Sequence, residues 1–353
     1  MEPWVGKARL TVMAVQSPPV ERAPAARFIG LLAALGVLVV AVGLSVWVGL
    51  KDIPFSTVLS ALLDGDGSTA SVTIRDVRLP RALLGVLVGA ALGLAGAVMQ
   101  ALTRNPLADP GLLGVTMGAS TAVVLAISVF GISSVLGHVW FGLIGAALAS
   151  LMVYALGATG RQVTTPDRLV LAGAAVSAVL FTVNSAILLL DPAAFNQFRF
   201  WNVGSLAGRE VGVLPVVVWF LAPGIVLAVL MGRALNALAL GDAAGRGLGA
   251  NVGRIRLVGV AAIMVLCGAA TAAVGPLVFV GLVVPLVARL IVGADQRWVL
   301  AYSAVLAPTL LVAADIVGRL VVQPGELQVG IVTAVLGAPV FIALCLRKRV
   351  GQW

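Results

Sequence analysis

Charged residues are scarce in this chain of 353 residues. Asp, Glu, Lys and Arg make up 10% of it, while hydrophobic residues make up 61% and the mean hydropathy is +1.12. A typical soluble domain carries about 25% charged residues. The chain is therefore expected to lie in a lipid bilayer. Each span needs about 20 apolar residues, so this length supplies about ten spans and leaves no room for a separate soluble catalytic domain.

Lysine and histidine are scarcer still, and their positions exclude several kinds of enzyme. Lys7, Lys51 and Lys348 all lie outside any G-x-x-x-x-G-K-[ST] sequence, so the chain has no P-loop and a partner must hydrolyse any ATP that is used. The single histidine, His138, excludes an H-E-x-x-H zinc site and argues against a Ser/His protease. No acidic or thiolate cluster is present in the sequence to bind a bare metal ion.

Apolar stretches of spanning length follow one another through most of the chain, separated by short loops. This pattern predicts an all-α, polytopic membrane protein with about ten transmembrane helices. The first stretch is longer than a signal-peptide core and lacks a small-residue cleavage site, so we expect it to be retained. The expected spans are Phe28–Leu50, Pro80–Leu102, Leu112–Phe130, Val139–Leu156, Leu169–Leu190, Val211–Met231, Leu257–Ala273, Leu277–Val292, Val299–Leu320 and Val329–Leu346.

The distribution of charge divides the chain into three regions. Residues 1–27 form a basic, proline-containing leader that we expect to be disordered, residues 28–346 form the transmembrane domain, and residues 347–353 form a short tail. With the amino terminus inside, 16 of the 23 Lys and Arg residues fall in inner segments and 7 in outer ones. This asymmetry predicts a multi-pass protein of the inner (plasma) membrane with both termini in the cytoplasm. It also explains the net charge of +9 without a nucleic-acid partner.

The second expected span carries small residues at every fourth position: Gly85, Gly89, Gly93 and Ala97. Such a stripe allows the backbone of another helix to approach closely, which stabilises helix pairs where apolar burial gives no driving force. We therefore expect another helix to pack closely against this span. The stripe says nothing about whether the protein is a channel, a carrier or a permease.

The longest inner loop between spans covers residues 233–256. It is too short and too polar to span the membrane, yet it carries regularly spaced leucines. Two short surface helices broken at Gly241 would gather these leucines on one face for a partner. An ordinary solvated loop is the alternative.

Six motifs occur in order along the chain. They are R-L-P-R at 78–81 with G-A-V-M-Q-A-L-T-R-N-P-L-A-D-P at 96–110, F-W-N-V-G-S-L at 200–206, the loop at 240–249, F-V-G-L-V-V-P at 279–285, A-D-I-V-G-R at 314–319 and L-G-A-P-V-F at 336–341. Together they resemble the motifs of the FecCD-type permeases, the membrane subunits of ATP-driven importers for iron chelates, haem and cobalamin. The resemblance covers nearly all of the chain after the leader.

The resemblance implies a type II ABC importer permease fold and a set of partners. These are a second permease subunit in a homodimer or close heterodimer, two cytoplasmic ATPase subunits and an extracytoplasmic substrate-binding protein. ATP and Mg would be bound by the ATPase, and this chain would bind no cofactor of its own. Among the substrates of the family, ferric siderophore comes first, with haem and cobalamin as the alternatives.

The resemblance also assigns the inner loop and the inner turn after the second span. The loop would dock on the ATPase, although Gly245 and Gly247 stand where a helix former is expected and should weaken its second helix. Asn105 and Leu107 match positions that narrow the cytoplasmic exit, while ordinary turn chemistry at Asn-Pro is the alternative. The matching residues of the ATPase-coupling loop are Leu240, Gly241, Asp242, Ala243, Arg246, Leu248 and Gly249.

On the outer face, Arg78, Arg81 and Arg319 match arginines that meet carboxylates of the binding protein. The planar guanidinium suits bidentate contact with a carboxylate. For Arg319 the alternative is a pair with Asp315, four residues earlier on the same helix. For Arg78 and Arg81 the alternative is a role as interfacial anchors.

Neutral polar residues in the fifth and tenth spans are the candidates for lining the pathway. Serine and threonine in a span often bond to their own helix, which is the alternative for most of them. An ion-coupled secondary transporter remains a second class of function, for which Asp315 is the strongest intramembrane carboxylate. The candidate lining residues are Ser177, Thr182, Asn184, Ser185 and Thr333.

Overall fold

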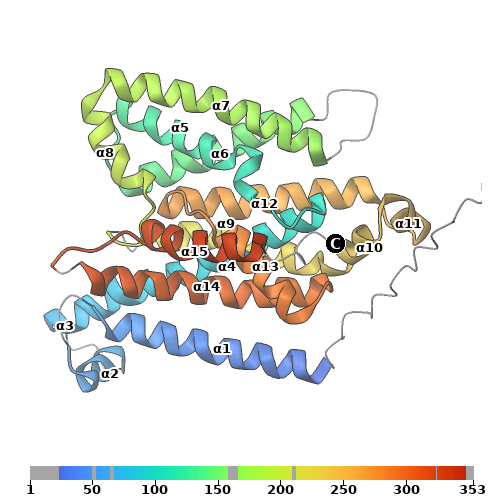
Figure 1. Ribbon diagram of the computed structural model, residues 1–353. Helices are drawn as coiled ribbons and strands as arrows, with labels where there is room; N and C mark the ends of the chain where they lie inside the picture. Colours follow the sequence, from blue (N-terminus) through green and yellow to red (C-terminus); the bar gives the residue numbers. More distant parts are fainter. Residues whose placement is uncertain are drawn as a thin grey trace, which may run out of the picture.

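The computed structural model describes residues 24–49, 53–63, 67–157, 166–208, 212–322 and 324–346. Helices account for the secondary structure of these residues, and no strand occurs among them (Figure 1). The all-α prediction is therefore confirmed. The expected tail, residues 347–353, lies outside the described residues, as does the leader up to residue 23. Residues 24–27 are an exception to the predicted disorder, because the first helix begins at Pro24, a residue whose fixed φ suits a first helical turn.

Eight helices of the described chain are long and apolar enough to cross a membrane, and two shorter apolar helices complete the ten that the sequence predicts. The short ones are α5 (Val115–Ser128) and α13 (Val280–Val292), each preceded by a residue in the left-handed region that ends the preceding segment. The long helices are α1 (Pro24–Trp47), α4 (Leu79–Thr103), α6 (Val135–Gly157), α7 (Pro166–Leu190), α9 (Val213–Leu230), α12 (Val252–Val274), α14 (Gln296–Val321) and α15 (Val329–Leu346).

Short helices at both ends of the bundle extend this arrangement. The sequence did not predict α2 (Phe55–Leu63), α3 (Thr69–Val72) or α8 (Pro192–Asn202), which lie at the end of the bundle drawn on the left in Figure 1. A six-residue π-helical segment, η1 (Thr73–Arg78), joins α3 to α4. At the opposite end lie α10 (Gly232–Ala239) and α11 (Asp242–Gly247), the two short helices expected in the inner loop.

The centre of the bundle is formed by α4 and α12, while α1 and α7 lie on opposite sides of it (Figure 1). The stripe on α4 explains the central position. A methyl group added at Gly89 would lie 2.5 Å from the Cα atom of Pro308 on α14, and one at Gly93 would meet the carbonyl of Ser303. These glycines therefore allow α4 and α14 to touch backbone to backbone. The predicted close helix approach is confirmed.

Candidate functional site

A cluster of four charged side chains ties the outer ends of α4 and α14 together. Arg81 donates from Nη2 to Asp315 Oδ1 at 2.7 Å and from Nη1 to Glu326 Oε2 at 2.8 Å. Arg319 also bonds to the Asp315 carboxylate, one turn along α14. Asp315 and Arg319 are almost completely buried, with 3% and 2% of each residue exposed. The predicted alternative for Arg319, pairing with Asp315, is therefore what the structure shows.

The remaining donors of two outer arginines bind the carbonyl end of α1. Arg319 donates from Nη1 to the Ser45 carbonyl at 2.7 Å and from Nη2 to Ser45 Oγ at 2.9 Å. Arg78 donates to the carbonyls of Val46 and Trp47 at 3.2 and 2.5 Å, and it is only 5% exposed. Cations suit the carbonyl end of a helix because its last carbonyls lack intrahelical partners.

These positions revise the prediction that three arginines face a binding protein. Arg78 and Arg319 are buried and bonded inside the chain, so their geometry supports a structural role in joining α1 to the bundle. The side chain of Arg81 is 11% exposed and lies beside Glu326, whose side chain is 24% exposed. Arg81 is thus the one member of the predicted trio that a carboxylate from outside could approach.

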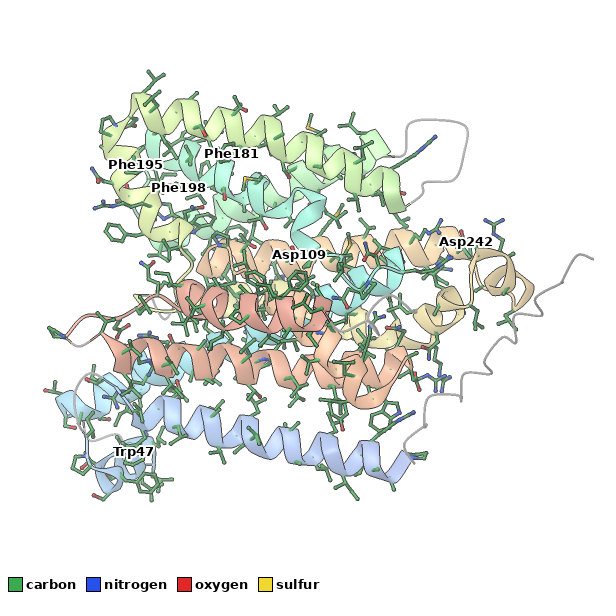
Figure 2. All side chains as sticks on the ribbon, in the orientation of Figure 1. Trp47, Asp109, Phe181, Phe195, Phe198 and Asp242 are labelled. Carbon is green, nitrogen blue, oxygen red and sulfur yellow. The ribbon has the colours of Figure 1, made fainter. Side chains whose placement is uncertain are left out.

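At the predicted inner end, Asp242 joins the loop at 233–256, which contains the predicted ATPase-coupling residues, to two spans. Its carboxylate accepts hydrogen bonds from Arg104, at the end of α4, and from Arg256 on α12, the latter at 3.0 and 2.8 Å. Figure 2 places Asp242 at the end of the bundle beside α10 and α11. Gly241, with φ 101°, separates the two short helices as predicted.

The loop has one packed face and one free face. Leu235 and Leu238 of α10 are completely buried, and a methyl group at Gly245 would lie 3.0 Å from the Ala237 carbonyl oxygen. Gly245 therefore permits close packing of α11 on α10, and α11 forms over Asp242–Gly247 in the single chain. On the other face Leu240 and Leu248 are 65% and 68% exposed. Ala243, Arg246 and Gly249 are exposed with them.

Asn105 and Leu107 lie in the turn after α4. The Asn105 side chain accepts a hydrogen bond from the Leu107 backbone N–H at 2.9 Å, so the turn chemistry proposed as the alternative is present. Leu107 itself is 43% exposed. The turn continues into a short 3-10 helix, η2 (Pro110–Leu113). Asp109, labelled in Figure 2, caps this helix by accepting a hydrogen bond from the Gly111 backbone N–H. Burial raises the pKa of the Asp109 carboxyl.

The candidate lining residues separate into two groups. Thr182 and Ser185 are exposed on α7 and bond to backbone carbonyls four residues earlier. Thr333 and Asn184 are 1% and 6% exposed in the single chain, and Thr333 donates to the Gly330 carbonyl. Ser177 is half-buried. Exposed alanines at positions 174, 175 and 178 continue the face of Thr182 along α7.

The outer helix α8 follows α7 at a sharp corner. Asp191 caps it by accepting hydrogen bonds from the backbone N–H groups of Ala193 and Ala194, and Ser128 of α5 donates to the same carboxylate at 2.8 Å. These bonds, first that of Ala194, hold the pKa of Asp191 below its usual value. Phe195 is exposed and Phe198 buried, so α8 lies flat on the bundle (Figure 2).

A groove of about 540 Å³ runs along the outside of α6, α9 and α12. Its walls are apolar, with Tyr154 the polar exception. It holds no charged group for a chelate. We therefore place it outside the candidate functional site.

Comparison with known proteins shows which family the chain belongs to. The profile of the FecCD transport family matches residues 37–347. The chain belongs to the FecCD transport family. It is 49% identical over 314 residues to the ferric enterobactin transport system permease protein FepD of Escherichia coli, covering 89% of this chain and 94% of that protein. It is 39% identical over 321 residues to the probable siderophore transport system permease protein YfiZ of Bacillus subtilis, covering 91% and 96%.

A solved structure agrees with the fold of this FecCD-family chain. It is described as a metal-chelate type ABC transporter in an inward-facing conformation. The two chains superpose with a TM-score of 0.79 at 24% identity, covering 91% of this chain and 99% of the other. The expected fold, that of an ABC transporter permease with many membrane helices, is thus confirmed, as is the family resemblance.

Sequence reasoning missed the partners that complete each charged cluster. Glu326 and Ser45 in the outer cluster, and Arg256 in the inner one, are separated from their partners by long stretches of chain. Gln100, completely buried in α4, donates to the Leu282 carbonyl of α13 at 2.9 Å. Its place in an apolar span was the available signal, since a buried amide needs a partner.

Proposed function

We propose that this chain is the membrane-spanning permease subunit of an ATP-driven importer that moves a ferric siderophore from an extracytoplasmic binding protein into the cytoplasm. The observation that carries the proposal is the 49% identity, over nearly the whole chain, to a ferric enterobactin permease. The relatives named for hemin and vitamin B12 are less similar, at 39% and 36% identity, so haem and cobalamin are the alternatives.

ATP hydrolysis belongs in this proposal to two separate ATPase subunits, which bind ATP and Mg in the cytoplasm. The exposed leucines of the coupling loop support a docking role, because Leu240 and Leu248 lie exposed beside Arg246 on a face that none of the described residues covers. Apolar anchors with a charged neighbour are typical of protein interfaces. Both termini then lie on the cytoplasmic side with this loop.

A second permease subunit would cover α7 and α15. These helices pack against the bundle on one side only, and α7 exposes small and hydroxyl side chains, including Ala178, Thr182 and Ser185, along its length. Small residues allow close helix approach, while hydroxyls offer hydrogen bonds to a chelate without stripping its iron. The pathway would therefore run between the two copies.

The structure weakens the case for an ion-coupled transporter. That function needs a carboxylate free to exchange a proton or sodium ion within the membrane. Asp315, the strongest candidate, is held by both Arg81 and Arg319 and is 3% exposed. A carboxylate whose oxygens are bonded to two guanidiniums has no free site for a cation.

The proposal is tested by purifying the chain with its ATPase and binding protein and offering a panel of cargoes. Binding-protein affinity and stimulated ATP turnover are measured with ferric catecholate, ferric hydroxamate, haem and cobalamin. The proposal expects the largest stimulation with a ferric siderophore. Stimulation by haem or cobalamin alone would assign the alternative cargo, and ATP turnover by the permease without a partner would refute the assignment as a permease subunit.

A further inference from the structure

The side chain of Asp242 is 32% exposed and bonds to arginines of two spans, although it belongs to the loop proposed to meet the ATPase. Both of its oxygens accept hydrogen bonds from Arg256, and one also accepts from Arg104. The neighbouring exposed groups, Leu240 and Leu248, carry the free face of the loop. We infer that Asp242 is a positioning residue that transmits movement of the coupling loop to the cytoplasmic exit, an inference that rests on the proposed function.

The first step of this link is mechanical. The α10 and α11 helices pack on each other through Gly245 and on the bundle through Leu235 and Leu238, so they move as one unit. Packed elements switch between discrete arrangements rather than deforming continuously. A push on the exposed leucines therefore displaces the Asp242 carboxylate together with its helix.

The second step leads from Asp242 to the exit turn. Arg104 is the last residue of the turn that closes α4, in the left-handed conformation with φ 49°. The next residue is Asn105, whose backbone N–H donates to the Gln100 carbonyl at 3.2 Å and whose side chain holds Leu107. Arg104, whose guanidinium bonds to Asp242, therefore belongs to the same short hydrogen-bonded segment as Asn105 and Leu107, the residues assigned to the gate.

The third step fixes the pivot. Arg256 lies in the second turn of α12, one of the two most enclosed spans, and its side chain is 11% exposed. A separate contact holds α10 to the start of α14, where Asn236 donates to Asp295 at 2.7 Å and accepts from the Gln296 backbone N–H. The loop is therefore anchored on α12 and α14. Of these polar contacts among the described residues, only the pair between Asp242 and Arg104 leads to the exit turn.

Replacing Asp242 should disturb this cluster more than replacing either arginine, because Asp242 carries its only negative charge among the described residues. One carboxylate neutralises two guanidiniums that come from different helices. Without it, Arg104 and Arg256 would repel each other, and the exit turn would separate from the loop. Loss of Arg104 instead leaves the Asp242 to Arg256 pair in place and breaks only the link to the turn.

The experiment compares Asp242→Asn and Arg104→Gln with wild type in the reconstituted complex. Three quantities are measured: the amount of ATPase that co-purifies, the binding-protein-stimulated ATP turnover, and the cargo taken up per ATP hydrolysed. We expect both variants to keep ATPase association and turnover within about twofold, and to lose at least fivefold in cargo per ATP. The double variant should be no more than about twofold worse than Asp242→Asn, since both changes break one link.

Two matched variants separate this role from docking and from misfolding. Leu240→Asp with Leu248→Asp alters the free face and should abolish ATPase association, which Asp242→Asn should not. Arg233→Gln removes an exposed cation from α10 that is not among the residues matched to the coupling loop, and it should leave cargo per ATP unchanged. If Asp242→Asn fails to fold, Arg104→Gln provides the test.

The outcomes that overturn the inference are distinct from those that overturn the proposed function. Asp242→Asn with unchanged cargo per ATP, or with the same loss of ATPase association as the leucine variant, would refute the link. A wild-type complex that takes up no cargo at all would refute the proposed function instead.

Discussion

Asp315 on α14 and Arg81 on α4 form a bidentate pair across the outer end of the bundle. Arg81 Nε lies 3.2 and 3.1 Å from the two carboxylate oxygens of Asp315, and Arg81 Nη2 lies 2.7 Å from Oδ1. The same carboxylate holds Arg319, which in turn binds the end of α1. One buried acid thus connects α1, α4 and α14.

Replacing Asp315 with Asn should lower the thermal stability of the purified protein strongly. The change removes the counter-charge of buried Arg319 and one of the two carboxylates bonded to Arg81, and breaking a buried ion pair typically costs about 3–5 kcal/mol. The measurement is the midpoint of thermal unfolding in detergent. Asp76→Asn, at an exposed acid of η1, is the control and should change the midpoint little. Equal midpoints for the two variants would contradict the structural role of Asp315.

Replacing Gly89 with Ala should force α4 away from α14. The new methyl group would lie 2.5 Å from the Pro308 Cα atom, and backbone cannot move aside as a flexible side chain can. Gly43→Ala on α1 is the matched control, because nothing lies within 4 Å of its added methyl group and alanine favours a helix by about 1 kcal/mol. Thermal unfolding should show a loss for Gly89→Ala and no loss for Gly43→Ala, and the reverse order would refute the close packing.

Replacing Arg78 with Gln should destabilise the outer end of α1 without abolishing docking of a binding protein. The guanidinium is buried and donates to the Val46 and Trp47 carbonyls, so its loss leaves those acceptors unsatisfied. Hydrogen exchange of residues 40–49 should become faster. Binding-protein affinity, measured on folded protein at low and physiological salt, should stay within about twofold. A large loss of affinity with unchanged exchange would restore the docking role expected from the family resemblance.

Replacing Asp191 with Ala should loosen α8. The carboxylate caps the helix and accepts from Ser128, and its pKa is lowered in the folded protein. A lowered pKa means that the cap contributes fully above the unfolded pKa of about 4 and is lost as the pH falls through the folded value. Hydrogen exchange of residues 192–202 should be faster in the variant at pH 7. Asn196→Ala, on the exposed side of α8, is the control, and equal exchange in the two variants would refute the cap.

The spans could be predicted well from the sequence because each is a long apolar run, which length and composition alone identify as a membrane helix. The tenth span was predicted with the bounds that α15 shows, Val329–Leu346. The two shorter spans were predicted too long, because Gly114 and Phe279 take the left-handed conformation and hold the residues before them outside the helix. A hydropathy profile contains no information about backbone dihedral angles. The short helices α2 and α8 were missed because helices of 9 and 11 residues cannot be told from loops by composition alone.

The candidate site was predicted less completely, for a different physical reason. The break at Gly241 follows from local chemistry, and the sequence located it. The burial of Arg78 and Arg319 depends on α1 ending beside them, which no local pattern reports. Likewise, Asp242 matched a coupling motif, but only the fold brings Arg104 and Arg256 to the same carboxylate.

The most direct test of the central claim is ATP-dependent uptake into proteoliposomes that contain this chain, its ATPase and the binding protein. Radioactive iron supplied as a ferric siderophore should accumulate inside when ATP is present on the cytoplasmic side, and should not accumulate with ADP or with an ATPase that cannot hydrolyse ATP. Accumulation that ignores ATP and follows a proton or sodium gradient would contradict the account.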